Sequence, residues 1–128
     1  MIYVDSSVAL ARLFTESSGP SDAFWRENLI SSKLLCYEIW NRIHAGRLAE
    51  IAGEEGRRLI DLIGFIDLIP MILARALEPF PVPVRTLDAL HLSTALFAIS
   101  NGQKVQLATY DDRVLAAAKA LKIPTFVL

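Results

Sequence analysis

The sequence predicts an α/β fold in which a central, mostly parallel sheet of about five strands carries helices on both faces. Three observations support this prediction. Short apolar segments alternate along the chain with longer segments of helical periodicity. The first apolar run, residues 2–4, is unbroken, as in a short strand that is buried on both faces of a parallel sheet. A length of 128 residues allows one sizeable core, so we expect residues 1–128 to form a single domain.

The expected strands are short apolar runs bounded by turn-forming or acidic residues. They occupy residues 2–4, 31–35, 64–70, 105–109 and 125–127. The expected helices occupy residues 8–14, 22–29, 37–48, 53–62, 72–78, 87–100 and 112–121. Polar residues 16–21 should form a loop, and the alternating prolines of residues 79–84 require an extended linker. Thr86 is expected to cap the helix that follows, and Asn101 and Gly102 should end it.

The composition predicts a soluble, cytoplasmic protein. Apolar residues make up 53% of the chain, slightly above the ~45–50% of typical soluble domains, which suggests an apolar partner surface. No uncharged run is long enough for a membrane span, and Asp5 interrupts the N-terminal apolar run, which argues against a secretory signal. The single cysteine, Cys36, excludes an internal disulfide and a cysteine zinc cage. The net charge of −1 offers no overall attraction for nucleic acid, so metals or a local patch would have to provide it.

Two predicted strands end in the same way, with an acid directly before a helix. Residues 2–4 lead into Asp5, and residues 105–109 lead through Tyr110 into Asp111 and Asp112. If these two strands are neighbours in a parallel sheet, their acids share one edge. Ligands of open α/β sheets bind at that edge, outside the carboxyl ends of the strands.

Two further acids lie near the starts of predicted helices. Glu38 is near the start of helix 37–48, and Asp88 occupies the first turn of helix 87–100, where the helix dipole favours a carboxylate. Each acid also has a purely structural interpretation, as a helix cap, a dipole partner or, for Glu38, an ion pair with Arg42. The residues alone leave both interpretations open.

Convergence of these acids would require a cation. Two carboxylates about 4 Å apart repel by ~4 kcal/mol at an effective dielectric constant of 20. Oxygen ligands without a cysteine or histidine cage favour Mg²⁺ or Mn²⁺, which also accept phosphate oxygens of a substrate. Such a site would bind phosphodiesters, activate water and stabilise the leaving oxygen.

Four sequence segments together resemble PIN-domain ribonucleases. They are Asp5-Ser6-Ser7, Tyr37-Glu38, Thr86-Leu87-Asp88-Ala89-Leu90-His91-Leu92 and Thr109-Tyr110-Asp111-Asp112-Arg113-Val114. The Leu-Asp-Ala-Leu-His-Leu run is the most specific of them. The length and the order of the segments are most similar to the VapC-type toxins of bacterial and archaeal toxin and antitoxin pairs. The resemblance spans nearly the whole chain and implies a PIN-like fold.

The resemblance implies an endoribonuclease that uses Mg²⁺ or Mn²⁺ and a metal-activated water to cleave RNA. The implied catalytic residues, which are also the implied metal ligands, are Asp5, Glu38, Asp88 and Asp111. Asp112 would substitute for Asp111 or assist it. Ser6 or Thr109 would supply a supporting hydroxyl that orients a carboxylate or a metal-bound water.

The resemblance also implies a homodimer and a cognate antitoxin. Such an antitoxin lays a helix along an apolar groove and reaches the acidic pocket with a basic side chain. Candidate groove residues are Phe14, Trp25 and Trp40. Four arginines lie close in sequence to the acids and are candidate phosphate contacts, with solvation or pairing to the acids as the alternative. They are Arg12, Arg42, Arg85 and Arg113.

Two other functions stay open at this point. A catalytically degenerate PIN module would bind RNA or protein without cleavage, although all four acids are present. A Mg-dependent phosphotransfer domain would need a lysine at a late strand end, and residues 125–127 contain none. A serine hydrolase is disfavoured because the chain has no Gly-x-Ser-x-Gly segment, and we interpret His91 as a packing and hydrogen-bonding residue.

Overall fold

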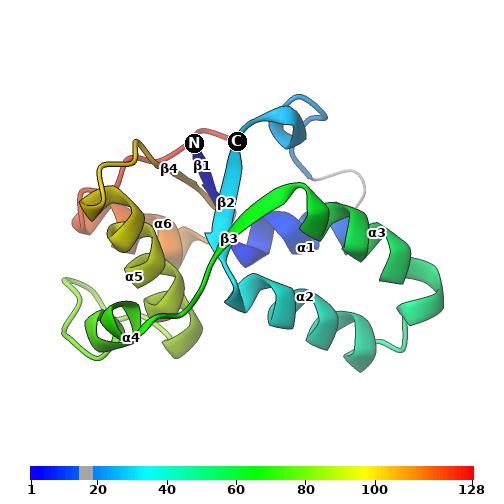
Figure 1. Ribbon diagram of the computed structural model, residues 1–128, viewed down its shortest axis with the longest axis horizontal. Helices are drawn as coiled ribbons and strands as arrows, with labels where there is room; N and C mark the ends of the chain where they lie inside the picture. The colour runs from blue at the N-terminus through cyan, green and yellow to red at the C-terminus, as the bar shows by residue number, and fades with distance from the viewer. Residues whose placement is uncertain (15–18) are drawn as a thin grey trace.

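The computed structural model describes residues 1–14 and 19–128 and confirms the α/β fold (Figure 1). The elements follow in the order β1 (Ile2–Val4), α1 (Ser6–Phe14), the 3₁₀ turn η1 (Phe24–Arg26), β2 (Leu29–Ser32), α2 (Leu34–Ala45), α3 (Ala49–Asp61), β3 (Ile63–Ile66), α4 (Pro70–Ala76), α5 (Thr86–Ser100), β4 (Gln106–Ala108) and α6 (Asp112–Ala120). Part of the loop predicted at residues 16–21 lies outside the described residues.

β1 lies inside the sheet, whose strand order is β3-β2-β1-β4. Ile2 of β1 pairs with Leu29 of β2 on one side and with Gln106 of β4 on the other. All pairings are parallel, and all of β1 is buried, as its unbroken apolar run predicted. Parallel pairing places the carboxyl ends of β1 and β4 at one edge, so Asp5 and Asp111 both follow the sheet at that edge.

The sheet has four strands in the described part of the chain, and the prediction of a fifth strand at residues 125–127 is wrong. Only an isolated parallel bridge joins Thr125 to Leu107 of β4. The N–H of Leu107 donates to the carbonyl of Pro124 over 2.8 Å, and the N–H of Phe126 donates to Leu107 over 2.9 Å. Because Pro124 has no N–H with which to extend the ladder, the pairing stops at one bridge.

The helix predicted at residues 22–29 is also wrong. A single 3₁₀ turn forms at Phe24–Arg26, and Leu29 instead begins β2, where it pairs with Ile2. Trp25 is only 6% exposed, because the turn packs it into the core. Strand pairing and burial of the aromatic side chain therefore override the local helical pattern.

The other differences are shifts of element ends. The strand predicted at residues 31–35 forms earlier, as β2, and the helix predicted at residues 37–48 also begins earlier, as α2.

Two residues at helix starts differ from their predicted roles. Pro70 begins α4 rather than ending a strand, a position that suits its missing N–H. Thr86 is the first residue of α5 and not its cap. The capping position belongs to Arg85, whose own backbone is extended.

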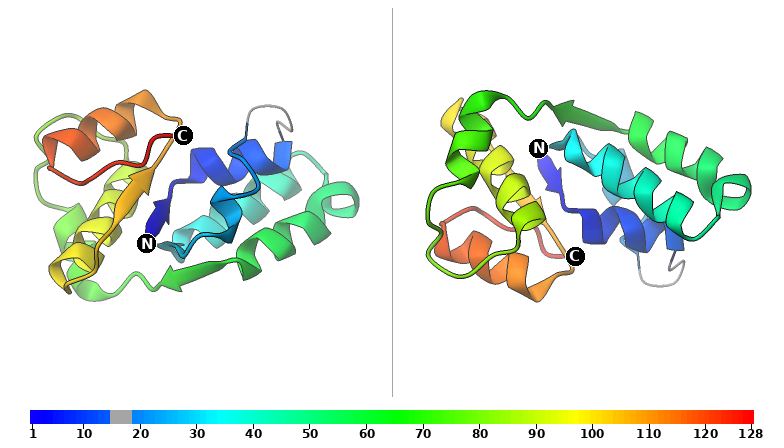
Figure 2. Two further views of the ribbon diagram at one scale, coloured as in Figure 1. Left: turned by 90° about the horizontal axis from the view of Figure 1, so that it is seen from above. Right: turned by 90° about the horizontal axis from the view of Figure 1, so that it is seen from below.

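Apolar side chains pack on both faces of the sheet, which confirms the prediction of helices on both faces. On one face the strands pack against α1, α2 and α3, with Leu35, Ile39 and Ile43 fully buried. On the other face Tyr3 and Leu107 pack against α5 and α6. The views from above and below show α1–α3 and α4–α6 as two groups on opposite sides of the strands (Figure 2).

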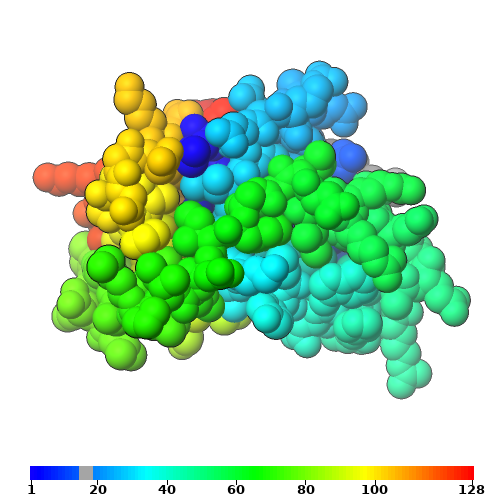
Figure 3. Space-filling model, viewed as in Figure 1, coloured from blue at the N-terminus to red at the C-terminus, as the bar shows by residue number. Residues whose placement is uncertain are grey.

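The linker between α4 and α5 is not helical, as its alternating prolines predicted, and it bends at residues 81 and 82. Residues 79–84 contain no helix or strand, and Phe80, Val82 and Val84 pack against the core beneath α5 and α6. The segment from α3 through β3 to α4 crosses the near face of the molecule in the space-filling view (Figure 3). Among the helices described, none has both the length and the apolar character needed to cross a lipid bilayer.

We predict that Leu92→Ala lowers the free energy of unfolding by about 2–5 kcal/mol, because Leu92 of α5 is fully buried. Leu73→Ala is the matched control, since Leu73 of α4 is 42% exposed and its truncation should change that free energy by no more than about 0.5 kcal/mol. Chemical denaturation of both variants measures the difference. Equal losses would contradict the assignment of Leu92 to the core.

Candidate active site at the carboxyl edge of the sheet

The four acids predicted from the sequence come from four separate parts of the fold. They are Asp5 after β1, Glu38 in α2, Asp88 in the first turn of α5 and Asp111 at the N-cap of α6. Hydrogen bonds through Thr109 and Arg85 join three of these acids into one network. The fourth acid, Glu38, is attached to α5 through His91.

Two hydroxyl groups hold one carboxylate oxygen of Asp5, a residue that is only 2% exposed. Ser7 Oγ and Thr109 Oγ1 both donate to Asp5 Oδ2, each over 2.7 Å. The second oxygen, Oδ1, is buried and has no hydrogen-bond partner among the described residues. Because burial of an unpartnered carboxylate oxygen is unfavourable, Oδ1 marks a position that a cation would stabilise.

Thr109 joins Asp5 to Asp111. While its Oγ1 donates to Asp5, the same atom accepts the backbone N–H of Asp111 over 3.0 Å. Asp111 caps α6, with its Oδ1 accepting the backbone N–H of Arg113 over 2.8 Å. Burial raises the pKa of Asp111, but the hydrogen bonds of the cap and the Arg85 guanidinium outweigh burial and hold the pKa below its usual value. Asp111 is therefore a helix cap and also part of the acidic network.

One guanidinium contacts two of the acids. Arg85 Nε donates to Asp88 Oδ2 over 2.8 Å, and Arg85 Nη2 donates to Asp111 Oδ2 over 2.6 Å. The hydrogen bonds to Asp88 and then to Asp111 raise the pKa of Arg85. Of the two interpretations that the sequence left open, this structure has Arg85 paired with the acids. Its side chain is 57% exposed, so the guanidinium is free to move outward without disturbing the core.

Glu38 contacts a buried histidine. His91 Nε2 lies 2.5 Å from Glu38 Oε1, and His91 Nδ1 lies 2.7 Å from the hydroxyl of Tyr3. That hydroxyl also accepts the backbone N–H of Ser32 over 3.1 Å. Burial raises the pKa of Tyr3 above its ordinary value, so the phenol keeps its proton. His91 is a packing and hydrogen-bonding residue, as predicted, but its two partners gave no signal in the sequence.

The structure also describes three other predicted residues, Ser6, Asp112 and Arg42. Ser7, next to the predicted Ser6, is the serine that donates to Asp5. The sequence could not separate these two serines, because the turn after β1 decides which side chain folds back. Asp112 is exposed in the first turn of α6, and Arg42 is exposed on α2.

Two of the predicted arginines lie in different surroundings. Arg12 pairs with two acids outside the network, Asp22 at 3.5 Å and Glu55 at 3.8 Å, so its guanidinium is engaged elsewhere. Arg113 lines a pocket of about 290 Å³ together with Arg85. Arg113 therefore stays close to the network, whereas Arg12 does not contact it.

The donor set fits a hard divalent ion, although the ligands are not assembled as a cage. The acids offer only carboxylate oxygens, which Mg²⁺ and Mn²⁺ prefer, and Asp5 Oδ1 lacks a donor. Within residues 1–14 and 19–128, no three acidic, histidine or cysteine side chains are grouped so that they could hold a metal ion. Mg²⁺ commonly takes one or two carboxylates and completes its coordination with water and phosphate oxygens. The residues are therefore compatible with such an ion, with Arg85 as the cation that balances Asp88 and Asp111 here.

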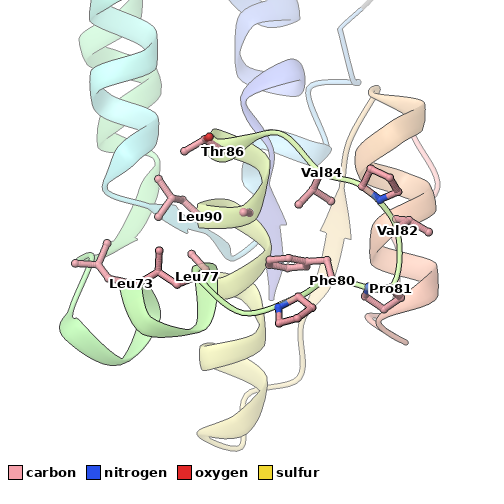
Figure 4. Close-up of a pocket in the computed structure, with 12 residues that line it drawn as sticks. Leu73, Leu77, Phe80, Pro81, Val82, Val84, Thr86 and Leu90 are labelled. Carbon is pink, nitrogen blue, oxygen red and sulfur yellow. The ribbon is translucent and has the colours of Figure 1, made fainter.

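An apolar hollow of about 710 Å³ lies between α4, the proline-rich linker and the start of α5. Its walls include Leu73 of α4, Leu77, Phe80 of the linker and Leu90 of α5 (Figure 4). It also includes Thr86, next in the chain to Arg85. The proline-rich linker thus builds an apolar wall beside the acidic network.

A second apolar hollow of about 720 Å³ runs along α2 and includes Glu38 and Trp40. Of the three predicted groove residues, Trp40 lines this hollow. Phe14 packs against the edge of the core, and Trp25 is buried within it, so Trp25 is not available to line an open groove. The prediction for Trp25 failed because the turn at η1 directs its ring inward.

Two comparisons with known proteins agree with this fold. The PIN domain family matches residues 2–121, and the chain belongs to that family. It is 36% identical over 127 residues to the Mycobacterium tuberculosis protein named ribonuclease VapC46, with 94% of this chain and 92% of the relative covered. It is 29% identical over 129 residues to ribonuclease VapC35 of the same species, with 96% and 93% covered. The resemblance to VapC-type PIN domains is thereby confirmed.

Thr109→Val keeps the shape of the side chain and removes the hydroxyl that joins Asp5 to Asp111. Because Asp5 Oδ2 then loses a donor and the Asp111 N–H loses its acceptor, we expect the free energy of unfolding to fall by about 1–3 kcal/mol. Thr86→Val, at the exposed start of α5, is the matched control and should stay within about 0.5 kcal/mol of the wild type. Chemical denaturation gives both values, and a Thr109→Val protein of unchanged stability would refute the bridging contact.

Arg85→Gln should raise the pKa of Asp111 toward its usual value, because it removes a positive charge and keeps the backbone cap. Carboxyl ¹³C NMR across a pH series measures this pKa, with Arg113→Gln as the matched control that should leave it nearly unchanged. Since the folded state lowers this pKa, Asp111 stabilises the fold at neutral pH, and that stabilisation is lost as the pH falls through the folded pKa. The contribution should be smaller in Arg85→Gln. An unshifted Asp111 pKa in that variant would contradict the ion pair.

Proposed function

We propose that this protein is a metal-dependent endoribonuclease that hydrolyses RNA phosphodiester bonds. The observation that carries the proposal is the acidic network. Thr109 contacts both Asp5 and Asp111, and Arg85 contacts both Asp111 and Asp88. The two relatives named as ribonucleases support RNA as the substrate. Membership of the PIN family favours this function over a phosphotransfer domain.

The residues that would hold one or two Mg²⁺ or Mn²⁺ ions are Asp5, Glu38, Asp88 and Asp111. A divalent ion bound there would supply an activated water nucleophile and would stabilise negative charge on the leaving oxygen. The hydroxyls of Ser7 and Thr109 occupy Asp5 Oδ2, which leaves Oδ1 as the oxygen available for a cation. Ser7 and Thr109 would together supply the supporting hydroxyls, a role that the sequence assigned to Ser6 or Thr109.

Arg85 would change partner when RNA binds. Arg85 now pairs with Asp88 and Asp111. A divalent ion held by these acids would balance their charge and would release the guanidinium. A phosphate group presents a pair of oxygens, as a carboxylate does, and arginine binds both in a bidentate way. Arg85 would then hold the RNA backbone at the rim of the site, with Arg113 beside it.

We further propose that the protein is the toxin of a toxin and antitoxin pair, that it acts in the cytoplasm, and that it forms a homodimer. The hollow along α2 includes Glu38, so a helix docked there would bring a basic side chain within reach of the acids. A neighbouring gene that encodes a DNA-binding domain with a C-terminal amphipathic tail would support this pairing. Its absence would favour a solitary enzyme.

A catalytically inactive PIN module is the second candidate. It is favoured by the ion pairs of Arg85, which already balance two acids, and by the lack of a preassembled metal cage among the described residues. Such a module would bind RNA or protein without cleavage.

Asp5→Asn and Asp88→Asn should each lower Mn²⁺-dependent RNA cleavage by more than the ~10–100-fold that changes in outer-shell partners cause. The assay follows a labelled single-stranded RNA on a denaturing gel, with and without a chelator. Asp67→Asn is the matched control, because Asp67 is an exposed acid between β3 and α4. Comparison of Asp111→Asn with Asp112→Asn identifies which of these neighbours acts, and we expect the larger loss at Asp111.

Cleavage by Asp5→Asn and Asp88→Asn at the wild-type rate would remove both residues from the mechanism. If the wild-type protein binds RNA and leaves it intact at every Mn²⁺ concentration, the inactive module is the better description.

A further inference from the structure

A chain of hydrogen bonds crosses the core from the backbone of β2 to the carboxylate of Glu38. The N–H of Ser32 donates to the Tyr3 hydroxyl, which contacts His91 Nδ1, and His91 Nε2 contacts Glu38 Oε1. Tyr3 is fully buried and His91 is 1% exposed, whereas the Glu38 side chain is 15% exposed. The chain therefore begins in the core and ends at an acid that reaches the surface.

If the His91 imidazole is neutral, only one assignment of donors and acceptors satisfies this series of hydrogen bonds. A carboxylate can only accept, so His91 Nε2 is the donor in the contact with Glu38. His91 Nδ1 is then bare and accepts the proton of the Tyr3 hydroxyl. The Tyr3 oxygen accepts the Ser32 N–H, a group that can only donate. Every link has one donor and one acceptor, and the network assigns the tautomer of the ring.

We propose that His91 is a positioning residue that holds the Glu38 carboxylate in place for a divalent ion, and that Tyr3 fixes the ring and the tautomer of His91. This inference rests on the proposed function of the site. Glu38 has a long side chain with several rotatable bonds, and a buried donor at Oε1 restricts it to one position. Partners behind metal-binding carboxylates commonly act in this way.

The placement of His91 on α5 supports this role. Asp88 and His91 are three residues apart, so they lie on the same face of the helix. Asp88 reaches Arg85 and the acidic network, while His91 reaches across to Glu38 on α2. One face of α5 therefore carries Asp88 itself and contacts Glu38 through the imidazole of His91. The buried Nε2 of His91 thus has a carboxylate of the proposed site as its partner.

Two variants separate the two hydrogen bonds of His91. In His91→Gln the amide nitrogen lies near the former Nε2 and keeps a donor toward Glu38. In His91→Asn the amide oxygen lies near the former Nδ1 and keeps an acceptor for Tyr3, but nothing reaches Glu38. Both variants remove the imidazole ring from the core, so a purely structural role would affect them alike. Denaturation curves record the stability of each variant.

The readout is Mn²⁺ binding without RNA, measured as the loss of the free-ion signal in electron paramagnetic resonance. We expect His91→Asn to weaken binding by about 10–100-fold and His91→Gln to stay close to the wild type. Equal affinity in His91→Asn and the wild type, or an equal loss in both variants, would overturn the positioning role. Asp5→Asn is measured in parallel. If it loses Mn²⁺ while His91→Asn does not, the inference fails and the proposed function stands, whereas a wild-type protein that binds no Mn²⁺ refutes both.

A second measurement does not depend on folding of the His91 variants. Long-range ¹H–¹⁵N correlation spectra of the wild-type protein report which imidazole nitrogen of His91 is protonated, and we expect the proton on Nε2. Tyr3→Phe keeps the aromatic ring and removes the donor to Nδ1, so it should mix the tautomers and weaken Mn²⁺ binding. A proton on Nδ1 alone in the wild type would overturn the proposed chain.

Discussion

Negative charge collected at one edge of the sheet is the constraint on which the rest of this site depends. Parallel pairing of β1 with β4 delivers Asp5 and Asp111 to the same edge, and α5 adds Asp88. Carboxylates that are this close and partly buried repel one another, because little water remains to screen them. Arg85 reduces this repulsion because its guanidinium contacts both Asp88 and Asp111. The same need for positive charge would suit a divalent ion, and such an ion would in turn attract the anionic phosphodiester.

The short strand β1 supports the site in two ways. Its side chains alternate between the faces of the sheet, so Ile2 and Val4 join the core under α1–α3 while Tyr3 joins the core under α5 and α6. The strand ends directly at Asp5, and Tyr3 contacts the histidine that faces Glu38. Packing of β1 therefore fixes Asp5 through the backbone and Glu38 through a buried hydrogen-bond chain.

The sequence predicted those features that follow from local pattern and chain direction. An apolar run before an acid predicted that Asp5 and Asp111 share an edge if their strands are neighbours, and the parallel pairing of β1 with β4 met that condition. The helix at residues 22–29 and the strand at residues 125–127 failed, because strand pairing and Pro124 decided those segments. Side-chain partners across long separations gave no signal. Glu38 and His91 are 53 residues apart, and Tyr3 and His91 are 88 residues apart, so only the folded chain shows that they meet.

A crystal of the protein soaked in Mn²⁺ tests the central claim most directly, through anomalous difference density at the manganese edge. The account predicts a peak next to Asp5 Oδ1, with the Arg85 guanidinium moved away from Asp88 and Asp111. A map without a peak beside Asp5, in which Arg85 keeps its contacts with Asp88 and Asp111 at full Mn²⁺ concentration, would contradict the account.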